Sequence, residues 1–72
     1  MAMQDTEIVF SVEEDPEGGY VARALGHAIF TEADDLSELR AMVRDAVATH
    51  FEEDEKPRII RLHFVHDEVL AV

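Results

Sequence analysis

Four histidines are the side chains of this sequence best suited to chemistry, because imidazole binds metals and transfers protons near neutral pH. They are His27, His50, His63 and His66. No two of them are four residues apart, the helical spacing that places two imidazoles on one face, and His63 and His66 point to opposite faces if they share a strand. The spacing favours surface or interface histidines, and we expect no metal and no cofactor.

Carboxylates gather in two runs, residues 13–15 and residues 52–55. Neither run has the alternating oxygen ligands and central glycine of a calcium loop. Ser11 and Ser37 are the only serines and there is no cysteine, so the sequence offers no evident nucleophile with a base beside it. We therefore expect no catalytic residues and a protein that is not an enzyme.

The charge balance points to the kind of partner. Seventeen acidic residues against six Lys plus Arg give a formal net charge of -11. A domain this acidic is repelled by phosphate backbones, so direct nucleic-acid binding is not expected, and the charge would attract a basic protein. The same acidity also serves solubility or reflects a salt-adapted or heat-adapted proteome, and composition alone leaves these interpretations open.

A chain of 72 residues predicts a single domain over residues 1–72. A domain of this size usually needs a disulfide, a metal or a partner subunit for stability, and without cysteine the expected remedy is association, as a homodimer. The first five residues lack the basic and apolar regions of a signal peptide, and no apolar run approaches the roughly 18 residues of a membrane span. A cytoplasmic protein that does not enter membranes is expected.

Alternating apolar residues predict three antiparallel strands in the first half of the chain. They cover residues 7–13, 20–25 and 28–31, and the first of them places Ile8, Phe10 and Val12 on one face. The first two strands are joined by a tight turn over residues 15–19, where proline fixes φ and two glycines permit positive φ.

From Asp35 the apolar period changes to that of a helix, which Asp35 and Glu38 begin as a capping box and which is expected to reach about Glu52. A polar linker ends in Pro57, and residues 58–65 resume a strand pattern. The tail over residues 66–72 predicts either a short extra strand or a kinked extension, buried in the sheet or in an oligomer interface. The apolar stripe of the helix consists of Leu36, Leu39, Val43, Ala46, Val47, His50 and Phe51.

Two segments carry a resemblance to a known family. They are the hairpin Glu-Asp-Pro-Glu-Gly-Gly-Tyr-Val-Ala of residues 14–22 and the helix start Thr31-x-x-Asp34-x-Leu36-x-Glu38-Leu39. In this order the chain resembles the HicB-like antitoxin domain, in a stand-alone short form without the DNA-binding tail. The resemblance implies a partial ribonuclease H-like α+β fold of order β-β-β-α-β, mostly antiparallel, with its last strand parallel to the first.

The resemblance also implies a function, the neutralisation of a small basic HicA-type ribonuclease toxin by protein contact. Nuclease activity is not expected of this chain, because residues 8–12 and 58–65 lack the carboxylates that a two-metal site needs on those strands. The residues expected to bind the partner are the acids of the hairpin and linker with two neighbours, namely Glu13, Glu14, Asp15, Glu17, Tyr20, Val21, Glu52, Glu53 and Asp54.

Two alternatives remain open at this point. One is an orphan structural or regulatory homo-oligomeric domain without a toxin partner, whose acidity serves solubility. The other is a metal or small-ligand sensor that uses the histidines.

Overall fold

The alternating segment near the start of the chain forms strand β1 (Glu7–Glu14) in a computed structural model that describes residues 7–72. Ile8, Phe10 and Val12 point to one side of this strand and are buried, which confirms the predicted face. β1 pairs on one side with β2 (Tyr20–Ala24) and on the other with β4 (Ile59–Phe64). The strand therefore lies inside the sheet and contributes a large part of the core.

The sheet has the strand order β3-β2-β1-β4, with β3 (Phe30–Ala33) at one edge and β4 at the other. The pairs β1–β2 and β2–β3 are antiparallel, whereas β4 runs parallel to β1. The order of elements along the chain is β-β-β-α-β. The predicted α+β class, element order and parallel last strand are thus confirmed.

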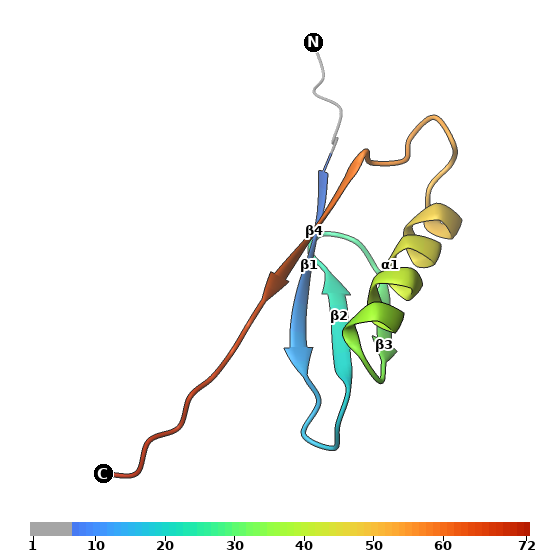
Figure 1. Cartoon of the computed structure of the whole chain (residues 1–72). Coiled ribbons are helices and arrows are strands. Elements are labelled where there is room, and N and C mark those ends of the chain that lie inside the picture. The colour runs from blue at the N-terminus through green and yellow to red at the C-terminus, as the bar shows by residue number, and fades with distance from the viewer. Residues whose placement is uncertain (1–6) are drawn as a thin grey trace.

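Helix α1 (Leu36–His50) crosses one face of the sheet, as Figure 1 shows. Leu39, Val43 and Val47 are buried, and the helix packs mainly against β3 and β2. The helix ends two residues before the predicted end, because Phe51 adopts an extended backbone and caps it through an N–H donated to the carbonyl of Val47. His50 is exposed and is not part of the buried stripe. Within residues 7–72, no helix is long and apolar enough to cross a membrane.

The third strand lies two residues later than predicted. Its register places Phe30 opposite Arg23 and Thr31 opposite Ala22, so that Thr31 is buried on the helix side and Phe30 is exposed on the other face. The connection after β2 is wider than a tight turn, with the carbonyl of Ile29 accepting from the N–H of Ala24. The segment Ala28-Ile29-Phe30-Thr31 predicts an earlier strand, but the register that follows this wider loop decides which side chains point inward.

The expectation of a buried tail is wrong for the single chain. No strand forms within residues 65–72, and Val69 and Leu70 are 92% and 75% exposed. Figure 1 shows the segment extending away from the sheet beyond the end of β4. One backbone bond, from the N–H of Val65 to the carbonyl of Val12, continues the ladder just past β4 before the chain leaves β1.

An ion pair joins the beginning of β1 to β4 on the face opposite the helix. Both Nε and Nη2 of Arg61 donate to the carboxylate of Glu7. The hydrogen bond from Arg61 is the main reason that the pKa of Glu7 lies below its ordinary value, and the same contact raises the pKa of Arg61. The pair links the two parallel strands on the face of the sheet that the helix does not cover.

We expect Leu39→Ala to lower the free energy of unfolding by about 2–5 kcal/mol, because Leu39 is fully buried and the helix is anchored through it. Met42→Ala is the control, since Met42 lies on the same helix and is exposed, and about 1 kcal/mol or less is expected there. Urea unfolding followed by circular dichroism measures both. Equal losses would contradict the placement of the core.

We expect Glu7→Gln to destabilise the fold at neutral pH and to lose this effect in acid. The folded pKa of Glu7 is lowered, so the stability that it contributes is present above its ordinary pKa and disappears as pH falls through the folded pKa. Urea unfolding of both proteins at a series of pH values measures the difference. In an Arg61→Gln background the same substitution should have a smaller effect, and an undiminished effect would rule out the ion pair as its cause.

Candidate functional site

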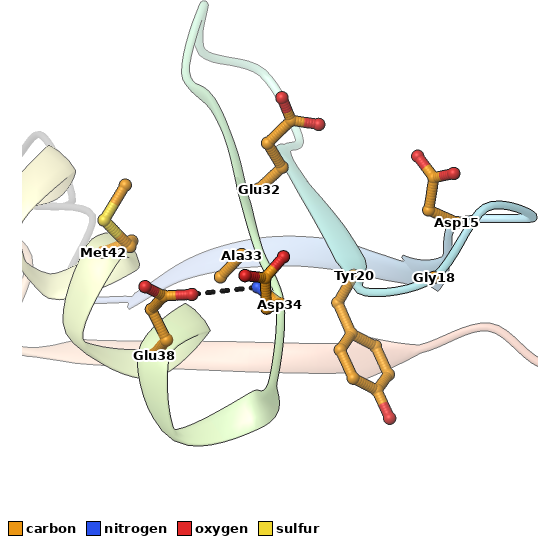
Figure 2. A pocket seen from close by; sticks show the side chains of 8 residues that line it. All are labelled: Asp15, Gly18, Tyr20, Glu32, Ala33, Asp34, Glu38 and Met42. Atoms are coloured by element: carbon orange, nitrogen blue, oxygen red, sulfur yellow. Dashed lines mark hydrogen bonds between the residues drawn. The ribbon is translucent and has the colours of Figure 1, made fainter.

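A pocket lined by carboxylates lies at the edge of the sheet formed by β3, between the β1–β2 hairpin and the first turns of α1. Its volume is about 310 Å³. Figure 2 shows the side chains of the hairpin, the strand end and the helix around it. We call it the acidic pocket, and its lining residues are Asp15, Gly18, Tyr20, Glu32, Ala33, Asp34, Glu38 and Met42.

The hairpin turn holds Asp15 at one wall of the acidic pocket. Oδ1 of Asp15 accepts from the N–H of Glu17 at 2.8 Å, and the backbone carbonyl of Asp15 accepts from the N–H of Gly18 at 2.9 Å. Gly18 and Gly19 have φ of 107° and 84°, a region that L side chains rarely adopt. The predicted role of the two glycines is therefore confirmed, and the turn presents its carboxylate in a fixed position.

The helix start holds the opposite wall. Oδ1 of Asp35 accepts from the N–H of Glu38 at 2.7 Å, which confirms Asp35 as the N-cap. The return bond differs from a standard capping box, because Oε1 of Glu38 accepts from the N–H of Asp34 at 2.9 Å. Glu38 is thereby drawn back toward the end of β3, and Figure 2 shows its carboxylate beside Asp34.

The electrostatics of the acidic pocket are one-sided. Four of its lining side chains are carboxylates, and within residues 7–72 no Lys or Arg lines it. The carboxylates of Asp15, Glu32, Asp34 and Glu38 are at least partly exposed, so they stay hydrated and require no buried partner. An arrangement of this kind attracts a guanidinium or an ammonium group from outside.

The acidic surface continues around the β3 edge onto the sheet face that α1 does not cover. In the strand register Val21 lies opposite Glu13 on β1 and opposite Glu32 on β3. Val21 is half-buried, so an apolar side chain lies between two carboxylates. An arginine or lysine can place its aliphatic stem on such a residue and its charge beside the acids.

The structure brings together only some of the residues predicted from the sequence. Asp15 and Tyr20 line the acidic pocket, and Glu13 and Val21 adjoin it through the register. Tyr20 is half-buried and packs against the core, because alternate residues of β2 face the helix. It is less available for an external contact than the sequence suggested.

The other predicted acids lie apart from this pocket. Glu14 lines a separate hollow of about 200 Å³ with Glu13, Val65, His66 and Asp67, beside the end of β4. Glu17 is exposed in the turn, where its N–H is bonded to Asp15.

The second acidic run lies after the far end of the helix. Glu52, Glu53 and Asp54 are exposed in the loop that follows α1, and Glu53 contacts Lys56 at 3.4 Å. Figure 1 places this loop at the opposite end of the molecule from the β1–β2 hairpin. The two acidic runs therefore do not form one continuous surface.

Three carboxylates of the acidic pocket are not among the partner-binding residues predicted from the sequence. Glu32 lies outside the strand predicted for residues 28–31, and Asp34 and Glu38 belong to the predicted helix start. The strand alternation could have identified Glu32. If the strand continues through Ala33, Glu32 points to the solvent side of the sheet. The proximity of these residues to Asp15 depends on strand pairing, which spacing along the chain does not contain.

The histidines are distributed over different parts of the molecule. His27 and His50 meet near the C-terminal end of α1, with ring centroids 6.0 Å apart, and both pack edge-on against Phe51. His63 lies on β4 and His66 follows it. Over residues 7–72, no group of three or more His, Cys, Asp or Glu side chains is arranged to hold a metal ion.

Two proteins of the UPF0150 type are similar to this chain. A UPF0150 protein of Archaeoglobus fulgidus is 58% identical over 52 residues, which cover 72% of this chain and 77% of that protein. A UPF0150 protein of Thermotoga maritima is 41% identical over 66 residues, which cover 92% of this chain and 93% of that protein. No family profile matches the chain, and no solved structure gives a significant match.

Gly19→Ala is expected to destabilise the protein more than Gly18→Ala does. Both positions have positive φ, which costs about 1–2 kcal/mol for a residue with a Cβ. At Gly19 the Cβ would also lie 2.6 Å from the backbone oxygen of Ala33, whereas nothing lies within 4 Å of one at Gly18. Urea unfolding compares the two variants. Equal losses would show that the hairpin does not approach β3 this closely.

Proposed function

The chain belongs to the UPF0150 family, and on this premise we propose that it is a non-enzymatic protein-binding module of the HicB-like antitoxin type. Its proposed partner is a small basic ribonuclease of the HicA type, which it neutralises in the cytoplasm. The observation that carries the proposal is the acidic pocket, where four carboxylates from three parts of the chain meet without a lining cation among residues 7–72.

Electrostatics supply the reason for neutralisation. A ribonuclease has to hold the phosphates of its substrate with lysine and arginine side chains. A surface lined by carboxylates binds the same cations and so competes with RNA for them. With a net charge of -11, the chain also attracts a basic protein from a distance, which speeds their encounter.

The surface around Val21 and the wall of the acidic pocket suit basic side chains with long apolar stems. Val21 between Glu13 and Glu32 offers apolar contact beside two charges, and Met42 adds a flexible apolar side chain at the wall of the acidic pocket. Contacts that combine apolar and charged groups orient the partner as well as attract it. The backbone edge of β3 lies alongside and offers N–H and C=O groups to an added strand.

A catalytic role is not proposed, although the resemblance implies a partial ribonuclease H-like fold. A two-metal nuclease site needs carboxylates placed toward one another on the central strands. The middle of β1 carries Val9, Phe10 and Ser11, and β4 carries no acid between Ile59 and Phe64. The carboxylates of β1 lie instead near its two ends, at Glu7, Glu13 and Glu14.

We expect Glu32→Lys/Asp34→Lys to weaken binding of the basic ribonuclease by at least about tenfold. The substitution replaces two carboxylates of the acidic pocket with ammonium groups, which repel the basic partner. Neither carboxylate caps the helix, so the fold should be retained. The measurement is calorimetric titration with the product of the neighbouring gene, together with inhibition of its RNA cleavage. Binding by the unaltered chain should weaken as salt rises.

Glu52→Lys/Asp54→Lys is the matched control. It changes the net charge by the same amount at exposed positions on the opposite end of the molecule. A small effect of this variant beside a large effect of the first would assign binding to the acidic pocket. Equal effects would mean that net charge alone acts, and absence of any complex with the unaltered chain would leave an orphan domain and reject the antitoxin function.

A further inference from the structure

The outer edge of β4 differs from the rest of the surface in charge and in coverage. β4 pairs with β1 on one side, and among residues 7–72 nothing pairs with its other side. Its six residues make it longer than the other edge strand, β3, which has four. An unpaired strand edge with apolar side chains is a template for another strand.

Apolar side chains on β4 remain partly uncovered because the helix lies over β3 and β2. Ile60 and Leu62 are only half-buried, and together with Val43 they line a groove of about 230 Å³ between α1 and β4. Phe64, the next residue on this face of β4, is 48% exposed. The groove and Phe64 form one apolar strip along the strand.

The same side of the molecule holds half of the basic residues of the chain. Arg40 and Arg44 line the groove and Arg58 precedes β4, whereas Arg61 lies on the opposite face of β4 and pairs with Glu7. Three of the six basic residues of a chain with a net charge of -11 are therefore close to the groove or to the start of β4. This makes the β4 side less acidic than the β3 edge, so the acidic charge of two copies opposes their contact less along β4, and a basic partner is disfavoured there.

The sequence around β4 is complementary to itself in reverse. Basic Arg58 precedes the apolar residues of the strand, and acidic Glu68 follows them at the same distance from His63. When two copies run antiparallel with His63 at the centre, and the tail continues the line of β4 as far as Glu68, Arg58 of each lies opposite Glu68 of the other. Leu62 of each then lies opposite Phe64 of the other, on the helix side of both sheets.

We propose that two copies of this chain associate through the outer edges of β4, in antiparallel register, to form one continuous sheet across a twofold axis. Phe64 of each copy packs beside Leu62 of the other at the groove under Arg40 and Arg44, and the Arg58–Glu68 pairs close the two ends. The contact explains why residues next to β4 stay exposed in the single chain. It is independent of the toxin partner and uses the opposite edge of the sheet.

Sedimentation of the full chain alone tests the proposal. The unaltered protein should sediment with twice its mass of 8.1 kDa over a broad range of concentration. Phe64→Glu should weaken association by at least about thirtyfold, the effect of removing a central aromatic anchor. Phe30→Glu is the matched control, because Phe30 is the comparably exposed phenylalanine of the other edge strand, 54% against 48%.

Retention of the dimer in Phe30→Glu with its loss in Phe64→Glu would support the proposal. A monomeric unaltered chain, or a dimer that survives Phe64→Glu, would overturn it. Loss of association in both variants would indicate head-to-tail pairing of β3 with β4 and would overturn it as well. Circular dichroism and amide spectra of each variant establish that the fold is intact.

Charge reversal at exposed positions gives a second test that does not touch the apolar strip. Arg58→Glu and Glu68→Arg should each weaken the dimer roughly tenfold, because symmetry repeats each altered pair. The double variant Arg58→Glu/Glu68→Arg should restore it. Weakening by the single changes without restoration by the double change would overturn the proposed register.

Discussion

A helix of fifteen residues has to cover one face of a four-stranded sheet, and the distribution of exposed surface depends on where it lies. It packs mainly on β3 and β2, where Leu39, Val43 and Val47 meet the core that β1 supplies. The antiparallel strands are therefore well covered. β4 is held by backbone pairing to β1, by the contact of Glu7 with Arg61 and by Ile60 and Leu62, which pack against the core but stay half-buried. A domain this small cannot cover both edges equally with the elements described over residues 7–72.

The two edges of the sheet consequently have different chemistry. The β3 edge is short and bordered by the carboxylates of the acidic pocket, whereas the β4 edge is longer, more apolar and bordered by arginines. Edges of opposite character favour different occupants, which reduces competition between them. A basic protein at the acidic pocket and a second copy along β4 would lie on opposite sides of one sheet, so each assembly leaves the other contact accessible.

The sequence predicted those features that depend on local pattern. Alternation identified β1 and its buried residues, and Asp35 identified the helix start, because each signal lies within a few residues. The pairing of β4 with β1 was expected from the family resemblance alone. The acidic pocket was only partly predicted, since Glu32 and Asp34 approach Asp15 through pairing between strands. The run of Glu52, Glu53 and Asp54 looked similar to the hairpin in composition but lies at the other end of the helix. The apolar tail suggested burial, and nothing in its own residues distinguishes contact within one chain from contact between two.

The parallel pairing of β1 with β4 brings the side chains of Glu7 and Arg61 into contact, although they are separated by 54 positions in the sequence. The hairpin and the β2–β3 pair close over short loops, so they can form early, whereas β4 has to wait for the intervening helix. During synthesis the edge of β1 that later pairs with β4 therefore emerges long before β4 is available. Until then this edge is open to strands of other chains, and the acidic residues Glu7, Glu13 and Glu14 at its two ends would discourage such pairing.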